Sequence, residues 1–153
     1  MQWAVCANGH SHWGPRGAAG LLLARNGLVL MQLRAAWVHR GGTWALPGGA
    51  RERDESATQA ALRESAEELG LSETHVDVRG SRRADCGGWI YETVLGAAIG
   101  EPDLRDRAES AAHRWVPEHQ VADLPLLPAF RQAWESPDRV LRDFVLGTLR
   151  AST

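Results

Sequence analysis

Three glutamates near the middle of the chain have the side-chain type and the spacing of a metal site. Glu64, Glu67 and Glu68 lie at positions i, i+3 and i+4, so on a helix they share one turn of one face. Each like-charged neighbour costs an isolated helix about 0.2–0.5 kcal/mol, and anions in the last turn also oppose the helix dipole. Arg63 can pair with Glu67, which leaves two carboxylates in need of a cation. A hard divalent ion that prefers oxygen ligands, Mg²⁺ or Mn²⁺, meets that need.

The residues around the glutamates predict where their helix begins and ends. Helix-forming residues run from about Ser56 to Leu69, after a glycine turn at Gly48-Gly49. Asp54 is a suitable N-cap, and Glu55 places a carboxylate near the positive end of the helix. Gly70 stands where a left-handed residue would end the helix.

The predicted helix also has an apolar side and a side lined by small residues. We expect the stripe of Leu62, Ala66 and Leu69, opposite the carboxylates, to pack on a β-sheet. The small residues near the carboxylates would leave room for the acids and their ligand. They are Ala57, Ala60 and Ala61.

The glycine turn and the acidic helix together resemble the Nudix box. The pattern consists of Trp44-Ala-Leu-Pro-Gly-Gly49, five residues, Glu55, seven residues, Arg63-Glu64 and Glu67-Glu68-Leu69-Gly70-Leu71. One position departs, because Ser65 stands where the family usually has a bulky aliphatic residue. That departure removes about 1–2 kcal/mol of apolar burial relative to a buried Leu or Val. The alternative explanation is a helix whose acidic residues only form a solvated face. Gly48-Gly49, Glu55 and the spacing favour the Nudix interpretation.

The resemblance implies a fold and an activity. The fold would be an α/β/α sandwich with a mixed β-sheet, in which the hairpin, glycine loop, acidic helix, later strands and C-terminal helices follow in that order. The activity would be Mg²⁺-dependent (or Mn²⁺-dependent) hydrolysis of a diphosphate linkage in a small nucleoside diphosphate derivative, by metal-activated water. A regulatory Nudix domain that binds a nucleotide without hydrolysis is the alternative, and the fold also carries a diphosphate isomerase. The intact acid set favours the hydrolase.

The resemblance also assigns roles to residues of the box. The expected metal ligands are the Gly49 carbonyl and the carboxylates of Glu64, Glu67 and Glu68. Glu64 or Glu68 would in addition orient or deprotonate the attacking water. Arg63 would anchor the carboxylates by pairing with Glu55 or Glu67, which makes its role structural.

Members of the family often take one more carboxylate from a loop downstream of the helix. The loop that precedes the strand ending near residue 117 offers Glu101, Asp103, Asp106 and Glu109. Glu109 stands shortly before Trp115-Val-Pro117, where similar sequences often carry such a Glu, and it could accept the proton of the water. The alternative is that Glu109 belongs to a charged surface loop, and both explanations stay open here.

The segment Arg34–Thr43 is a loop that leads straight into the glycine turn, so its side chains should overhang the acidic helix. Trp37 could stack on a base, and Arg34 and Arg40, together with Arg51 after the turn, could hold phosphate. For Trp37 simple packing is an equally open explanation. We expect Trp44 to pack under the turn.

Strand and helix signals flank the box on both sides. The dipeptide Asn26-Gly27 suits a type I′ turn and predicts a β-hairpin of Ala18–Arg25 and Leu28–Leu33, whose apolar runs indicate burial on both faces. The further expected elements are a short strand Val76–Arg79, a turn Asp85–Gly88, a strand Trp89–Ala98, a strand end His113–Pro117, and helices Ala129–Glu135 and Asp138–Leu149. In the last helix Val140, Leu141, Phe144 and Val145 share one face.

The first seventeen residues are polar and contain Cys6, His10 and His12. These types bind zinc, but the spacing Cys-x3-His-x-His does not complete a tetrahedral structural site. We therefore expect a surface lead-in with solvated imidazoles. Cys86 is the only other cysteine, and it forms no spaced metal motif with Cys6.

Composition indicates an ordinary globular domain. The chain has 153 residues, 44% of them hydrophobic and 24% charged, and a net charge of −2, which argues against a nucleic-acid polymer or a membrane surface as partner. We expect one domain over 1–153, with a lead-in at 1–17 and C-terminal helices at 128–153. The scarcity of cysteine and the lack of a visible signal peptide or apolar span favour a reducing cytoplasm. An oligomer is left open.

Overall fold

The computed structural model describes residues 3–107 and 109–149. The strands of the main sheet are β3 (Ala18–Arg25), β4 (Leu28–Arg34), β5 (Trp44–Ala45), β6 (Gly48–Ala50), β7 (Val76–Cys86), β8 (Trp89–Ala98) and β9 (Ser110–Pro117). The helices are α1 (Ala57–Leu69), α2 (Glu118–Val121), α3 (Pro128–Trp134) and α4 (Val140–Gly147), with a short 3-10 helix at Glu73–His75. A separate hairpin is formed by β1 (Trp3–Val5) and β2 (Ser11–Trp13).

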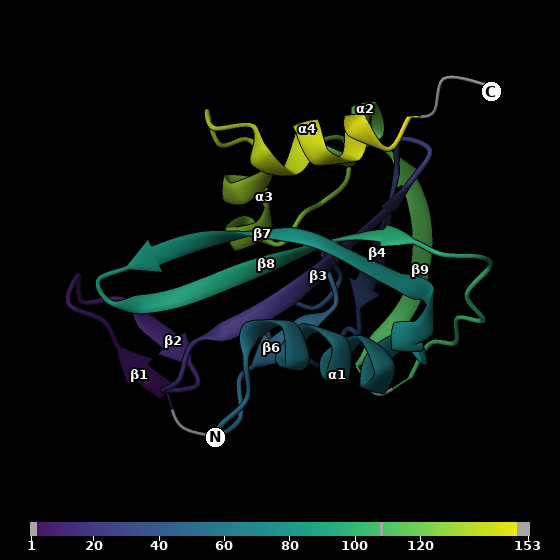
Figure 1. Ribbon diagram of the computed structural model, residues 1–153. Coiled ribbons are helices and arrows are strands. Elements are labelled where there is room, and N and C mark those ends of the chain that lie inside the picture. Colours follow the sequence, from purple (N-terminus) through teal and green to yellow (C-terminus); the bar gives the residue numbers. More distant parts are fainter. Residues whose placement is uncertain (1–2, 108, 150–153) are drawn as a thin grey trace.

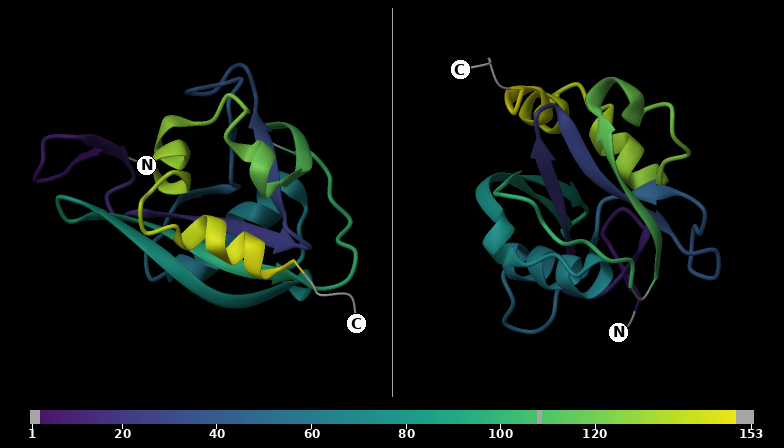
Figure 2. Two further views of the ribbon diagram at one scale, coloured as in Figure 1. Left: turned by 90° about the horizontal axis from the view of Figure 1, so that it is seen from above. Right: turned by 90° about the vertical axis from the view of Figure 1, so that its right-hand side faces the viewer.

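The main sheet lies between one helix and three others (Figure 1). Its strand order is β5-β4-β3-β8-β7, with β6 paired to β3 and β9 paired to β4. The pair β3 and β8 is parallel, whereas β3 and β4 are antiparallel. Helix α1 covers one face, and α2, α3 and α4 cover the other (Figures 1 and 2). The α/β/α sandwich with a mixed sheet is confirmed.

Strand β3 supplies side chains to both layers of the core, as expected of an apolar run buried on both faces. Leu22 and Ala24 belong to a cluster with Phe130, Trp134 and Leu141 under α3 and α4. The side chains that alternate with these pack toward α1; they are Ala19, Leu21 and Leu23. The two layers are therefore built from one strand, with a period of two residues.

The predicted β-hairpin is confirmed. Asn26 and Gly27 have φ values of +51° and +76°, which are the left-handed conformations that a type I′ turn requires at both central positions. Gly27 also donates its N–H to Thr148 Oγ1 at 3.0 Å, which ties the turn to the residue after α4.

Helix α1 begins one residue later than predicted, with a different cap. Ser56 Oγ accepts the Gln59 N–H at 3.0 Å, and Gln59 Oε1 accepts the Ser56 N–H at 2.8 Å, which is a capping box. The prediction of Asp54 as N-cap is wrong, because Asp54 lies in the preceding loop with φ of +61°. Gly70 ends the helix in the left-handed conformation with φ of +67°, as predicted.

The face of α1 that packs on the sheet is the one that carries the acids. The residues it buries are Ala57, Ala60, Ala61, Ser65, Glu68 and Leu69. Leu62 is only half-buried and Ala66 is exposed, so the predicted packing stripe is wrong: of its three residues only Leu69 is buried. The physical reason is that alanine and serine let the helix approach β3 closely, and this approach brings the carboxylates against the sheet.

Two strands extend beyond their predicted ends. Strand β7 continues to Cys86 because it pairs with β8 as far as the register Cys86↔Trp89, so the turn consists of Gly87 and Gly88 alone. Strand β9 begins at Ser110.

The C-terminal helices match the expectation closely. Leu141 and Val145 are buried and Val140 and Phe144 pack beside them, as predicted for one face of α4. Residues 1, 2 and 150–153 of the expected lead-in and C-terminal segment lie outside the described residues. Within the described chain, every helix is too short or too polar to span a bilayer.

Candidate active site

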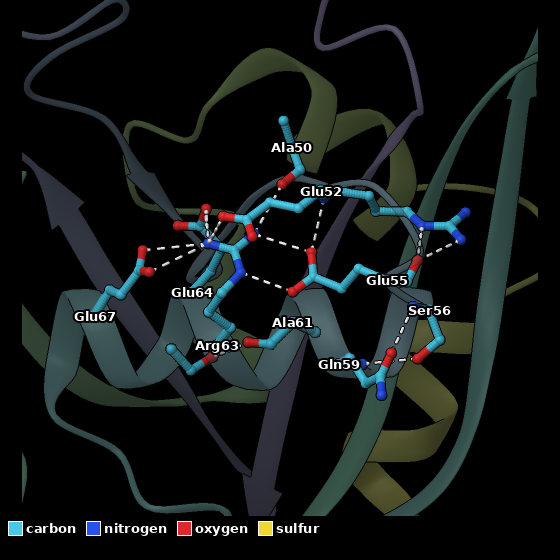
Figure 3. Close-up of polar contacts among 11 residues, drawn as sticks. Ala50, Glu52, Glu55, Ser56, Gln59, Ala61, Arg63, Glu64 and Glu67 are labelled. Carbon is cyan, nitrogen blue, oxygen red and sulfur yellow. Dashed lines mark hydrogen bonds and ion pairs between the residues drawn. The ribbon is translucent and has the colours of Figure 1, made fainter. Parts of the chain in front are cut away.

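Arg63 joins the loop before α1 to the acidic turn of the helix (Figure 3). Its Nε donates to Glu55 Oε2 at 2.7 Å, and its Nη2 donates to Glu55 Oε1 at 3.1 Å and to the Ala50 carbonyl at 3.0 Å. Its Nη1 donates to Glu64 at 3.1 Å and to Glu67 at 3.3 Å. The expected pairings with Glu55 and Glu67 are thus both present, and the fork geometry orients both carboxylates of α1 that it contacts.

The three glutamates of α1 differ in exposure. Glu67 is the most open, with 55% of its side chain exposed, whereas the Glu64 side chain is 18% exposed. Glu68 is buried and forms a hydrogen bond with the Gln32 amide of β4. The exposure of the three side chains therefore decreases from Glu67 through Glu64 to Glu68, which lies at the edge of the core.

Gly49 lies directly beside the Glu64 carboxylate. A Cβ built on Gly49 would lie 2.5 Å from Glu64 Oε1, so a larger residue here would force the Glu64 carboxylate to move. Gly49 is held in place by its pairing with Ala19 in β3. The structure thus brings the Gly49 backbone and the Glu64 side chain together, as the resemblance to the Nudix box implied.

The charge of the acidic turn is only partly balanced by the protein. Burial and the hydrogen bond with the Glu64 carboxyl raise the pKa of Glu68 to about 9, against the opposing effects of Gln32 and Arg34. In contrast, the hydrogen bond from Arg63 lowers the pKa of Glu55. Arg63 therefore forms its shortest ion pair with Glu55 and a longer one with Glu64. Within the described residues Glu68 has no ion pair, so the buried carboxylate keeps an unmet need for positive charge.

This donor set fits a hard divalent cation. It offers carboxylate oxygens and a backbone carbonyl, which Mg²⁺ and Mn²⁺ prefer over nitrogen or sulfur. Within the described residues, Gln32 Oε1 is buried and lacks a hydrogen-bond partner, so the cluster also has an unsatisfied neutral oxygen beside Glu68. Both observations indicate that a cation or its water would complete the cluster.

Sequence reasoning missed two polar residues next to the acids. Gln32 is a single polar residue inside the apolar strand β4, and that interruption was the available signal. Tyr91 as a whole is half-buried. Its hydroxyl lies against the backbone of Gly20, and a Cβ at Gly20 would collide with this hydroxyl. Burial of this hydroxyl, together with the charges of Glu68 and Glu64, raises the pKa of Tyr91. Tyr91 is therefore a neutral hydrogen-bond donor at the edge of the site.

The loop between β4 and β5 is organised by Arg34. Its Nη2 and Nε donate to the His39 carbonyl at 2.8 and 3.1 Å. Trp37 is 77% exposed, and Arg40 is exposed with φ of +58°. The loop therefore presents Trp37 and Arg40 to solvent, while Arg34 holds its base.

Arg51 and Trp44 flank the glycine turn and have local partners. Arg51 donates from Nη2 and Nε to the Glu55 carbonyl at 2.7 and 3.1 Å, which closes the loop before α1. Trp44 is half-buried and packs against the core cluster that contains Phe130 and Trp134, so its expected packing role is confirmed. A phosphate-binding role for Arg51 stays a prediction. Phosphate would have to bind the guanidinium N–H groups that do not donate to Glu55.

The loop that carries Glu109 lies across the C-terminal end of α1. The backbone N–H groups of Arg105 and Arg107 donate to the carbonyls of Leu69 and Glu68 at 2.7 and 2.9 Å. The Glu109 carbonyl accepts the Ala35 N–H at 2.7 Å, and its side chain is exposed. Glu109 is therefore placed between the acidic turn and the β4–β5 loop.

Outside this site, the structure assembles a second cluster that sequence spacing did not reveal. Ligand atoms of Cys6, His10, His12 and Cys86 all lie within 4.8 Å of one another. We name these four residues the Cys–His cluster. The expectation of an incomplete motif in a surface lead-in is corrected here, because Cys86, the last residue of β7, is a fourth member.

Comparison with known proteins gives one family. The NUDIX domain model matches residues 14–144. A Mycobacterium tuberculosis protein named "Putative 8-oxo-dGTP diphosphatase 3" is 46% identical over 144 residues, covering 87% of this chain but only 66% of that protein. The CTP pyrophosphohydrolase of Escherichia coli is 31% identical over 111 residues, covering 71% of this chain and 80% of that protein. The crystal structure of a Nudix hydrolase from M. smegmatis has a TM-score of 0.83 at 42% identity, covering 99% of this chain and 98% of that one.

Proposed function

Because this chain belongs to the NUDIX domain family, we propose that it hydrolyses a diphosphate linkage in a nucleoside diphosphate derivative with Mg²⁺ as cofactor. The observation that carries the proposal is the acidic turn of α1, where Glu64 lies beside Gly49, Glu68 is buried against Gln32 of the sheet, and Arg63 orients Glu64 and Glu67. Mn²⁺ is the expected substitute, since it takes the same ligands.

In this proposal the chain's own groups bind, orient and exchange protons. Gly49, Glu64, Glu67 and Glu68 are the proposed ligands, and when bound the cation would neutralise diphosphate charge and acidify a coordinated water. Burial raises the pKa of Glu68 in the metal-free chain, and a bound cation would favour its ionised form. Glu64, Glu68 or Glu109 would accept the proton of the attacking water.

The names of the relatives favour a nucleoside triphosphate as substrate. Those names specify 8-oxo-dGTP for the M. tuberculosis protein and CTP for the E. coli protein. The β4–β5 loop supports a base-binding role, since Trp37 is open for stacking and Arg40 for phosphate. We propose Arg34 as the residue that positions this loop, because it holds the His39 carbonyl.

The test is release of phosphate or pyrophosphate by the full chain across a panel of 8-oxo-dGTP, CTP, ordinary nucleoside triphosphates, ADP-ribose and a dinucleoside polyphosphate. We expect hydrolysis of at least one compound, its loss in excess EDTA, and its recovery when Mg²⁺ is added in excess over the chelator. Calorimetric binding of a nucleotide with Mg²⁺ but without hydrolysis would overturn the proposal in favour of a regulatory domain.

A further inference from the structure

We propose that the Cys–His cluster is a tetrahedral Zn²⁺ site that fastens the β1–β2 hairpin to the turn between β7 and β8. Three of its members come from the hairpin and its turn, and the fourth is the last residue of β7, eighty positions from Cys6. Figures 1 and 2 show the hairpin and the β7–β8 turn at the same edge of the molecule.

The distances within the cluster are close to those of a zinc site. Cys6 Sγ lies 3.2 Å from Cys86 Sγ, and His10 Nδ1 lies 3.0 Å from Cys86 Sγ. With Zn–S of about 2.3 Å and Zn–N of about 2.0–2.1 Å, ligand atoms of a tetrahedral site lie roughly 3.3–3.8 Å apart. The cluster would therefore need to open by roughly half an ångström at these two edges.

His12 provides an independent sign that a ligand is required. In the described part of the chain, its Nε2 is buried and has no hydrogen-bond partner. The imidazole stacks on the Trp89 ring at 4.0 Å with an interplanar angle of 6°, and Trp89 Nε1 in turn donates to the Gly14 carbonyl at 2.7 Å. The ring is thus held in place, and a coordinate bond would satisfy a buried nitrogen that the protein leaves unsatisfied.

The backbone of the two turns is in contact without any metal. Ala7 donates its N–H to the Gly87 carbonyl at 2.9 Å, and the β1–β2 turn is closed by hydrogen bonds between Cys6 and His10 and between Gly9 and Cys6. A Cβ on Gly87 would lie 2.6 Å from the Ala7 nitrogen, so glycine is required for this approach. The ligands are therefore preorganised by secondary structure on both sides.

The donor set selects a different cation from the acidic turn. Two thiolates and two imidazoles suit Zn²⁺, whereas Mg²⁺ requires oxygen ligands. Two thiolates also balance the charge of one Zn²⁺, with release of the two thiol protons to solvent. Both cysteines are free, and their sulfurs are farther apart than the roughly 2.05 Å of a disulfide bond.

Metal binding here would also affect the β4–β5 loop. Trp3 of β1 contacts the His39 ring edge to face, with 6.3 Å between ring centroids. His39 is the residue whose carbonyl Arg34 holds. The zinc site would therefore help to position the β4–β5 loop through Trp3 and His39. It would contribute no ligand to the acidic turn.

The test uses the full chain, reduced and freed of metal, titrated with Zn²⁺ and with Co²⁺ as a spectroscopic probe. We expect about one equivalent bound per chain, visible bands of tetrahedral Co²⁺, a thiolate-to-Co²⁺ charge-transfer band, and protection of both thiols from a thiol reagent. The variants Cys86→Ser and His10→Ala should lose affinity by about tenfold or more. His10 is exposed, so its variant keeps the core intact even if Cys86→Ser fails to fold.

Two control variants separate this site from other metal-binding groups. Glu67→Gln should retain the thiolate band, and His119→Ala, at an exposed histidine of α2, should bind Zn²⁺ like the parent chain. Uptake that is unchanged in Cys86→Ser and His10→Ala, a missing charge-transfer band, or a Cys6–Cys86 disulfide that forms while the reduced chain takes up no metal would each overturn the proposal. These readouts are independent of nucleotide hydrolysis.

Discussion

At the scale of single residues, the acidic turn of α1 contains groups that look alike in sequence but differ in environment. Glu68 is buried against Gln32, Glu64 is enclosed beside Gly49, and Glu67 is mostly exposed near Arg63. Burial raises the pKa of Glu68, whereas Glu67 is the carboxylate with the most exposed side chain. A substitution at Glu67 therefore tests ligand charge with the least disturbance of packing.

We expect Glu67→Gln to lower kcat by at least about 10²-fold, or ~3 kcal/mol of transition-state stabilisation, because it removes one charge from the proposed ligand set. Melting temperature should stay close to that of the parent, since the side chain is 55% exposed. Glu73→Gln, at an exposed acid beyond the helix, is the matched control. Full activity of Glu67→Gln would contradict the ligand assignment.

Glu109 is the second residue whose role depends on its surroundings. If it accepts the water proton, Glu109→Gln should lose kcat and the acidic limb of the pH–rate profile, with little change in KM. Glu101→Gln is the control, because Glu101 is 81% exposed and pairs with Arg25 at 2.9 Å. Equal and small effects of the two substitutions would place Glu109 among ordinary surface acids.

At the scale of elements, α1 combines a packing face and a chemical face on the same side. Ser65 is fully buried on this face, and its hydroxyl donates to the Ala61 carbonyl at 2.7 Å. The family usually has a bulky aliphatic residue at this position. In this chain a small residue is fully buried there, between the helix and the sheet. The burial of Ser65 is as predicted, and its polar group is satisfied inside the helix.

We predict that Ser65→Leu overpacks this interface. The larger side chain should lower the free energy of unfolding by about 1–3 kcal/mol. At about 2–4 °C per kcal/mol for a chain of this size, that change is readily seen in a thermal melt. Ser65→Ala is the matched control. It removes only the hydroxyl, which is both the donor to the Ala61 carbonyl and a small packing volume, so its stability should stay within about 1 kcal/mol of the parent. A higher melting temperature for Ser65→Leu would mean that the interface has unused space.

An ion pair joins Glu55, which lies just before α1, to Arg63 within the helix. This pair makes the free energy of unfolding depend on pH. The folded pKa of Glu55 lies below its ordinary value of 4.5 because Arg63 bonds the ionised form. The pair therefore stabilises the fold above about pH 4.5, and this contribution is lost as pH falls through the lower, folded pKa.

Glu55→Gln tests this linkage. At neutral pH we expect the variant to be less stable than the parent by about 1–2 kcal/mol, since charged hydrogen bonds are lost but solvent screens part of the effect. Urea unfolding at several pH values should show the gap closing as pH falls from 4.5 through the lower, folded pKa of Glu55, where the folded parent also loses this charge. A gap that persists unchanged in acid would assign the loss to packing instead of charge.

At the scale of the whole molecule, the sheet separates the layer that carries the chemistry from the layer that carries much of the core. Trp134 is 1% exposed between α3 and the sheet, on the face opposite α1. Trp37, in contrast, is 77% exposed on the β4–β5 loop. The two tryptophans therefore allow stability and substrate binding to be perturbed separately.

We expect Trp134→Ala to lower the free energy of unfolding by about 3–5 kcal/mol while kcat, measured well below the melting point, changes little. Trp37→Ala should do the reverse: it should leave the melt unchanged and raise KM for the nucleotide, at a cost of about 1–3 kcal/mol if a base stacks on the ring. Unchanged KM in Trp37→Ala would remove Trp37 from the proposed substrate site.

The sequence by itself determined the features that depend on neighbouring residues. Asn26-Gly27 predicts its turn because few other dipeptides tolerate left-handed φ at both positions, and Gly70 predicts the helix end for the same reason. The Nudix box was likewise readable, since its spacing is that of one turn and one helix. The error at Asp54 was also local: Ser56 and Gln59 form a capping box that sequence alone contained.

The tertiary structure decided what depends on contacts between distant segments. Which face of α1 meets the sheet was set by the close fit of small residues on β3, and this contact gave Glu68 its partner Gln32, thirty-six positions away. Cys86 joined Cys6 because the register of β7 and β8 carries their turn to the β1–β2 hairpin. Periodicity and caps report on one segment at a time, whereas these juxtapositions depend on how whole strands and helices pair and pack.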